Sequence, residues 1–218
     1  CDQFNLNYPI NIINIGGITN VTSIIDNENI DKDIHAYDIA PGNCLIDEWI
    51  RKKSNKKFDD KGEMAFSGKI DELILNQAID NFEILTIKKS LDIKSFDISF
   101  VKGLSIEDGC ATLTKFTAHL IAEGLKKIDK LNQTQIKNFI LCGGGRKNKT
   151  LINHINQYLY NENPIIKNID EFKINGDFVE SQAFAYLAVR SFLNLPISFP
   201  NTTRCLKPSS GGVVIKNF

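Results

Sequence analysis

The sequence has 218 residues, 42% hydrophobic and 24% charged, which is typical of a globular protein with one large or two small domains. Its 26 basic and 26 acidic residues cancel, so no overall field attracts the chain to nucleic acid or to an anionic membrane. No apolar run is long enough to span a bilayer and no signal peptide is visible, so we expect neither nucleic-acid nor membrane partners.

The first predicted element is a hairpin near the N-terminus. Residues 10–15 read INIINI, a β-branched run that suits a buried strand. Gly16 and Gly17 stop this strand, and apolar and polar residues alternate again over 18–25. The pattern predicts a strand, a tight glycine turn and a second strand. Successive amides in such a turn can cradle a phosphate, although Gly-Gly can equally serve only as a hairpin turn.

An acidic residue ends the next predicted strand. A short strand stops at Asp38, and a Pro-Gly-Asn turn leads into an apolar-periodic helix over residues 42–53. An acid at a strand end, followed by a glycine turn into a helix, is a typical place for catalysis on an anionic substrate. Asp38 could instead cap a turn, and Asn43 could cap the helix. Asp47 shares a helix face with Asn43, where it would line the site or complement the helix dipole.

The middle of the chain reads as mainly helical. Short helices are expected over 64–68 and 70–79, followed over 83–104 by a loop with a short strand or turn. Ser105 opens a long helix, because Ser-Ile-Glu-Asp resembles a capping box and large apolar residues then recur at helical spacing. Trp49 falls on the apolar face of its helix, so we expect it in the core.

A second glycine turn follows the next predicted strand. Residues 136–142 read IKNFILC, three glycines follow, and a helix is expected to begin near Asn148. A helix N-terminus behind a glycine turn offers free amides and a positive dipole end to an anion. The segment matches neither the Walker loop nor GxGxxG, and a turn that needs positive φ is the plain alternative. Two such turns at strand ends suggest one nucleotide held between the edges of two sheets.

A short strand over 165–169 and a long helix over 177–195 complete the predicted elements. The helix begins Asp-Phe-Val-Glu, in which Asp177 suits the N-cap and Glu180 the partner position of a capping pair. We favour capping for Asp177, whereas Glu180 could both cap and face a ligand. Strands that alternate with helices after a hairpin-rich start predict an α/β fold.

Cysteine and histidine spacing does not predict a metal or thiol site. Five cysteines are scattered without a CxxC pair, and three histidines lack ligand spacing with them, so no metal ligands are predicted. Neither Cys110 nor Cys142 has a histidine at any motif spacing, so we propose no thiol nucleophile. Reduced, buried cysteines are usual in cytosolic proteins, and a cytoplasmic location is expected. His35 and His154 are interpreted as ordinary polar residues.

Five segments, in the same order and at similar spacing, resemble anhydro-N-acetylmuramic acid kinases. They are NIGGITNVT, YDIAPGNCLID, DGCATLTKFTA, FILCGGGRKN and GDFVESQAFAYLAVRSFLNLPISFPNTT. The resemblance implies the RNase H-like fold of sugar kinases, actin and Hsp70, in which two lobes close over ATP. It also implies a kinase that uses ATP and Mg²⁺, opens the 1,6-anhydro ring of its amino sugar and phosphorylates O6. The product would be N-acetylmuramic acid 6-phosphate, in cell-wall recycling.

The resemblance implies a role for each matching site residue. Asp38 matches the catalytic base, which would activate the water that attacks the anomeric carbon. Asp47 and Glu180 match further family positions, and with Asn43 they are the predicted substrate contacts. A homodimer is also suggested. Six residues match nucleotide-binding positions: Gly16, Gly17, Asn20, Gly143, Gly144 and Gly145.

The chain departs from the family pattern in two places. Many members carry KSTGRE where this chain has KSLDIKSFD, so only Lys89, Ser90 and Phe96 fit. Nothing resembles the GTMSGTSLDG-type phosphate loop of the first lobe. Residues 1–218 are therefore expected to form the C-terminal lobe alone, with weak or no activity in isolation. Two alternatives stay open: another hexosamine or sugar kinase of the same fold, and a non-catalytic nucleotide-binding module related to actin and Hsp70.

Overall fold

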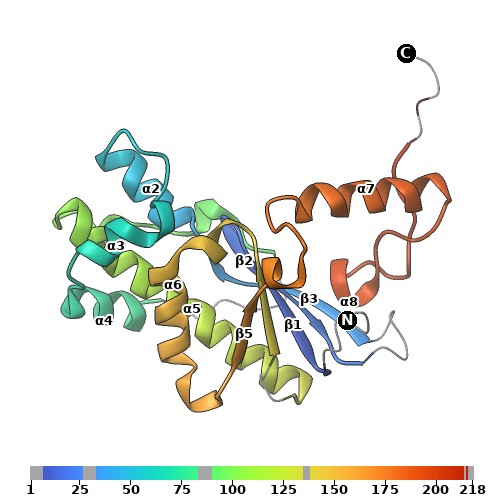
Figure 1. The fold of residues 1–218 in the computed structure, drawn as a ribbon, viewed down its shortest axis with the longest axis horizontal. Helices are drawn as coiled ribbons and strands as arrows, with labels where there is room; N and C mark the ends of the chain where they lie inside the picture. Colours follow the sequence, from blue (N-terminus) through green and yellow to red (C-terminus); the bar gives the residue numbers. More distant parts are fainter. Residues whose placement is uncertain (1–6, 27–32, 83–89, 135–137, 214, 216–218) are drawn as a thin grey trace.

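The computed structural model describes residues 7–26, 33–82, 90–134, 138–213 and 215. One mixed sheet lies at its centre, with the strand order β3-β2-β1-β4-β5 (Figure 1). The first three strands are antiparallel neighbours, whereas β4 runs parallel to β1 and β5 parallel to β4. The predicted α/β class is confirmed. The strands are β1 (Ile10–Ile15), β2 (Ile18–Ile24), β3 (Ile34–Pro41), β4 (Asn138–Cys142) and β5 (Ile165–Asn168).

The isoleucine run of β1 reflects burial on both faces of the sheet. Ile13 and Ile15 enter the main core together with Val21 of β2. Ile10 enters a smaller cluster on the other face, which includes Ile140 of β4. A strand that is covered on both faces needs apolar side chains at nearly every position, unlike a strand with one wet face.

Helix α5 (Ile106–Asn132) covers the main-core face of the sheet. Ser105 caps it as predicted, because the Ser105 hydroxyl accepts from the Asp108 amide at 3.1 Å. The capping box is only half formed, since the Asp108 carboxylate accepts from the Lys69 amide instead, at 2.7 Å. The predicted apolar face is buried, and its residues are Leu113, Phe116, Leu120, Ile121 and Leu125.

Helices α2, α3 and α4 lie together at one end of the molecule, and α7 lies on the opposite side (Figure 1). Trp49 of α2 is in the core as predicted, 1% exposed, and its indole nitrogen donates to the Ile106 carbonyl at 2.9 Å. This bond satisfies the one polar atom of a buried tryptophan and joins α2 to the start of α5. The remaining helices are α2 (Cys44–Lys53), α3 (Glu63–Ser67), α4 (Glu72–Asp80), α6 (Lys149–Tyr158), α7 (Val179–Phe192) and α8 (Pro200–Thr203).

One predicted strand boundary is wrong, and one predicted loop is confirmed in its described part. The strand that was expected to stop at Asp38 continues to Pro41, because β3 remains paired with β2 up to that residue. Residues 90–104 form a loop with 3-10 turns at Ile93–Ser95 and Ser99–Val101, so the turn and not the strand is present among the two predicted alternatives. The rest of the predicted 83–104 loop, including Lys89, lies outside the described residues. Within the described residues, no helix combines the length and hydropathy needed to cross a membrane.

Candidate active site

The two glycine turns meet at one edge of the sheet. Because β1 and β4 are parallel neighbours, with Asn14 opposite Cys142, both strands end at the same edge. The two glycine turns therefore belong to one sheet, and not to two sheets as predicted. At Gly143 φ is +78°, and a Cβ atom there would lie 2.3 Å from the Asn14 side-chain oxygen. Only glycine can adopt this φ without strain and leave room for the Asn14 side chain.

The Pro-Gly-Asn turn ties β3 and α2 to the first glycine pair. The Gly42 amide donates to the Gly17 carbonyl at 2.9 Å, and the Asn43 amide donates to the Gly16 carbonyl at 2.7 Å. Asn43 occupies the N-cap position of α2, but its side chain makes no capping bond. Its amide nitrogen instead lies 3.5 Å from the Ile15 carbonyl. The capping interpretation of Asn43 is therefore wrong, and the residue joins α2 to the end of β1.

A row of polar side chains crosses the sheet next to these turns. Asp38 lies opposite Asn20, Asn20 opposite Asn14, and Asn14 opposite Cys142. Directly opposed residues project from the same face of a sheet. Their chain neighbours, such as Ile13, enter the main core, so the row occupies the other face. The Asp38 carboxylate accepts from the Leu91 amide at 2.9 Å, so the loop after Ser90 approaches the row.

A cleft of about 480 Å³ opens over this row. It brings together four of the predicted site residues, namely Asn20, Gly143, Gly144 and Glu180. Its lining also includes Asn14 and Arg146, which were not singled out from the sequence. Asn14 could have been found as one of two asparagines that interrupt the isoleucine run, the one nearer the glycine turn.

The other predicted site residues lie beside this cleft and do not line it. Gly16 and Gly17 form the turn at the end of β1, and Asp38 stands in the polar row. Gly145 serves packing, because a Cβ atom there would lie 2.2 Å from the Ile15 side chain. Gly144 and Gly145 belong to a 3-10 turn, Gly144–Lys147, which leads from the end of β4 towards α6. Helix α6 begins next to Asn148 as predicted, and the Asn148 side chain caps it by accepting from the Leu151 amide at 2.9 Å.

A second cavity of about 310 Å³ lies on the other side of Gly144. Asn43 and Asp47 both line it, as expected from their shared helix face, and Ile46 and Phe58 add apolar surface. The pKa of Asp47 is raised to about 6, mainly by burial; Arg51 opposes this shift and Asp59 adds to it. The Arg51 guanidinium lies 4.0 Å from the Asp47 carboxylate.

The raised pKa of Asp47 predicts a pH-dependent difference in stability. In the unfolded chain the carboxyl titrates near pH 4, so the folded state holds this proton more tightly. Stabilisation by the protonated group is complete below pH 4 and is lost as the pH rises through 6. Between pH 4 and pH 7, we expect the free energy of unfolding of Asp47→Asn to rise by about 2 kcal/mol relative to that of the wild type. Urea unfolding across this range measures it, and a difference that does not vary with pH would contradict it.

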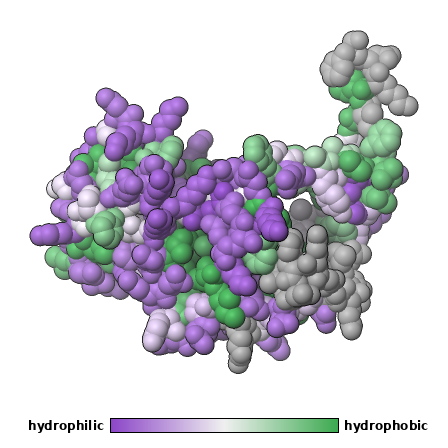
Figure 2. Space-filling view, viewed as in Figure 1, coloured by the Kyte–Doolittle hydropathy of each residue, from purple (hydrophilic) through white to green (hydrophobic). Residues whose placement is uncertain are grey.

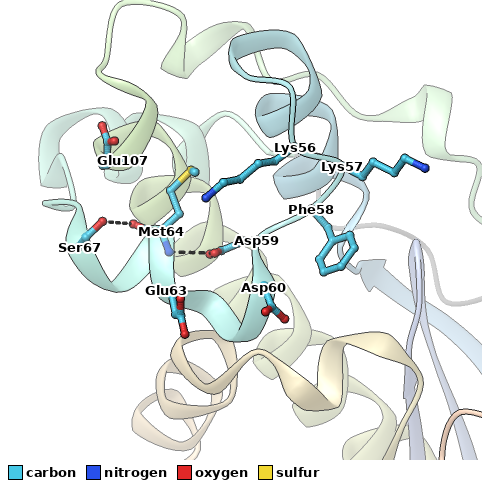
Figure 3. Close-up of a pocket in the computed structure, with 9 residues that line it drawn as sticks. All are labelled: Lys56, Lys57, Phe58, Asp59, Asp60, Glu63, Met64, Ser67 and Glu107. Carbon is cyan, nitrogen blue, oxygen red and sulfur yellow. Dashed lines mark hydrogen bonds between the residues drawn. The ribbon is translucent and has the colours of Figure 1, made fainter.

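A third hollow, of about 720 Å³, lies between the segment before α3 and the start of α5 (Figure 3). Its nine lining residues include none of the predicted site residues. The Asp59 carboxylate is occupied there, because it accepts from the Met64 amide at 2.8 Å and the Ala65 amide at 3.0 Å. We therefore assign the hollow no part in the candidate site.

The buried cysteines and the acidic residues near the site offer neither a reactive thiol nor a metal-binding cluster within the described residues. Burial raises the pKa of Cys44 to about 11 and raises the pKa of Cys142 as well, so both thiols are poor nucleophiles at neutral pH. The described part of the chain holds no group of three or more His, Cys, Asp or Glu residues that could bind a metal ion.

Comparison with known proteins shows the family to which the chain belongs. The family profile described as anhydro-N-acetylmuramic acid kinase matches residues 5–217. A Pelagibacter ubique protein named anhydro-N-acetylmuramic acid kinase is 48% identical over 219 residues, covering 100% of this chain and 58% of that protein. A Zymomonas mobilis protein with the same name is 39% identical and covers 94% of this chain and 54% of its own length. The chain thus spans about half the length of the curated relatives it matches.

Two solved structures are more distantly similar, each at 15% identity and a TM-score of 0.43. One is the activator of the 2-hydroxyisocaproyl-CoA dehydratase from Clostridium difficile with bound ADPNP, covering 76% of this chain and 56% of its own. The other is component A of the Acidaminococcus fermentans (R)-2-hydroxyglutaryl-CoA dehydratase, and the match covers 77% of this chain and 57% of that one.

Proposed function

Because this chain belongs to the anhydro-N-acetylmuramic acid kinase family, we propose that it supplies one side of the catalytic cleft of an ATP-dependent sugar kinase. The substrate is 1,6-anhydro-N-acetylmuramic acid, and the product is N-acetylmuramic acid 6-phosphate. The meeting of both glycine turns with a row of polar side chains at one sheet edge carries this proposal.

The glycine turns are the proposed nucleotide site. Gly143 and Gly144 bring backbone to the rim of the 480 Å³ cleft, where amides can approach phosphate oxygens without interference from side chains. The 310 Å³ cavity beyond Gly144 offers Ile46 and Phe58 as apolar surface for the base. Mg²⁺ would neutralise phosphate charge when it is bound with ATP.

Asp38 is the proposed general base. It removes a proton from a water molecule whose oxygen attacks the anomeric carbon, and the bond from that carbon to O6 breaks. O6 then takes the γ-phosphate and ADP leaves, so one water and one ATP are used for each sugar. The backbone bond from Leu91 holds the Asp38 carboxylate in place. Glu180, across the cleft from the sheet, is the proposed contact to the sugar.

The apolar surface of α7 supports a need for additional polypeptide. No residue of this 14-residue helix is buried, and Phe184, Tyr186 and Phe192 are 65%, 60% and 70% exposed. Hydrophobic side chains accordingly lie on the surface around α7 and the segment after it (Figure 2). Patches of this kind mark interaction surfaces. We propose that the part of the relatives beyond the matched length covers α7 and completes the ATP cleft.

ADP release tests the proposed reaction. We expect the complete gene product to release ADP with ATP, Mg²⁺ and 1,6-anhydro-N-acetylmuramic acid, and not with N-acetylglucosamine. The 218-residue chain alone should show weak or no turnover. Release with N-acetylglucosamine would favour a general hexosamine kinase. ATP binding without release in either case would favour a non-catalytic nucleotide-binding module, and full activity of the 218-residue chain would refute the need for additional polypeptide.

A further inference from the structure

A buried arginine lies between the second glycine turn and the start of α7. The Arg146 side chain is only 2% exposed. Its Nε donates to the Asp170 carboxylate at 2.8 Å, and its Nη2 donates to the Asp177 carboxylate at 2.9 Å. Its Nη1 donates to the Gly143 carbonyl at 2.9 Å. One guanidinium group therefore bonds to three separate segments of the chain.

These bonds explain why Asp177 does not cap α7, which corrects the sequence prediction. The N-cap position belongs to Phe178, and no side chain makes a capping bond there. The Asp177 carboxylate is instead shared by Arg146 and by Lys147, whose amine lies 2.7 Å away. A charge-assisted bond to a buried guanidinium is stronger than a bond to a neutral helix amide.

The bonds among Arg146, Asp170 and Asp177 fix the position of the start of α7. Since α7 buries none of its residues, the contacts at its N-terminus largely determine its direction. Val179 packs on the smaller core, and Asp177 bonds to Arg146. The Gly176 amide donates to Asp170 at 2.9 Å, and a Cβ atom at Gly176 would lie 2.4 Å from Arg146 Nε. The backbone thus crosses directly over the guanidinium group immediately before the turn that carries Glu180.

Arg146 is poorly placed to bind a phosphate itself. Its side chain is almost fully enclosed, and both terminal nitrogens and Nε already donate to protein acceptors. The bond to Asp170 raises the pKa of Arg146, and the bond from Arg146 lowers the pKa of Asp170. The guanidinium and its two carboxylate partners therefore stay charged at neutral pH, which suits a permanent clamp and not a ligand-exchanging group.

We propose that Arg146 is a positioning residue that holds the Gly143–Gly144 turn and Glu180 at a fixed separation across the cleft. This inference rests on the proposed function for its kinetic consequences, but the positioning itself does not. Misplacement of a binding group by about 1 Å can cost about 100-fold in rate. Lysine keeps the charge but has no planar fork, so it cannot bond to three acceptors in this geometry.

Two variants separate the links. Arg146→Lys weakens all three bonds of the guanidinium, whereas Asp177→Asn weakens only the bonds that Arg146 and Lys147 make to Asp177. We expect Arg146→Lys to speed amide hydrogen exchange over both 143–147 and 179–183, and Asp177→Asn to speed it over 179–183 alone. In the complete gene product, both should lower kcat about 100-fold per folded molecule and raise the KM for the sugar. Asp177→Asn should leave the Kd for ADP unchanged. Lys126→Gln, which breaks a partly buried 3.0 Å pair with Glu123 on α5, is the control.

The outcomes separate this inference from the proposed function. Unchanged exchange in both segments, or wild-type kcat and KM in folded variants of lower Tm, would show that Arg146 only stabilises the fold and would overturn the inference. If the wild type proves inactive yet the two exchange patterns appear, the positioning role stands and the proposed function fails. Should Arg146→Lys not fold, exchange in Asp177→Asn decides, because Asp177 is 52% exposed and leaves the bond between Arg146 and Asp170 in place.

Discussion

Replacing Asp38 by asparagine is expected to lower the kcat of the complete gene product by about 100- to 10,000-fold. Asparagine has nearly the same shape and retains an oxygen that can accept from the Leu91 amide, so the fold should persist. It cannot take a proton from water, so the chemical step loses its base. The Kd for ADP should stay within about twofold of wild type, because the predicted nucleotide contacts come from the glycine turns.

The measurement is single-turnover ADP formation together with ADP titration. Asp80→Asn is a matched control, since Asp80 is an exposed carboxylate at the end of α4 and lines none of the cavities described above. Equal turnover in Asp38→Asn and wild type would refute the assignment of Asp38 as the general base. A large loss of ADP affinity would instead place Asp38 in nucleotide binding.

Gly143→Ala should produce the largest loss of stability among single glycine substitutions at the site. At φ +78° and ψ 172°, Gly143 adopts a conformation almost restricted to glycine. The added Cβ atom would also lie 2.7 Å from the Ile15 carbonyl oxygen, which β1 holds in place. Strain and overlap together should lower the free energy of unfolding by about 2–4 kcal/mol. Displacement of the turn should weaken ADP binding more than about tenfold.

Urea unfolding and ADP titration measure the two effects of Gly143→Ala. Gly103→Ala is the control, because a Cβ atom at Gly103 would meet nothing within 4 Å and its φ is not in the left-handed region. Equal stability of the two variants would show that β1 and β4 do not fix the turn as described. A destabilised Gly143→Ala with unchanged ADP affinity would remove the turn from the nucleotide site.

Local patterns in the sequence determined most of the elements of this fold. The isoleucine run, the Gly16-Gly17 stop and the renewed alternation predicted β1 and β2. The serine before an apolar-periodic segment predicted the start of α5. Each of these signals depends on backbone propensity and side-chain period within one element, and both act over a few residues. Asp38, Gly143 and Gly144 were also recognisable, because glycine turns and acids at strand ends are local features.

Tertiary structure alone decided how these pieces meet. Pairing of β1 with β4 placed the two glycine turns at one edge of one sheet, and no local pattern encodes which strands become neighbours. It likewise aligned Asn14, Asn20 and Asp38 in one row. The same limit explains the error at Asp177. Adjacent residues predicted that Asp177 caps α7, but its carboxylate bonds to Arg146, which is 31 residues away in sequence. A buried guanidinium needs charged partners from wherever the fold supplies them, because leaving such a charge unpaired in the interior costs more than losing a helix cap.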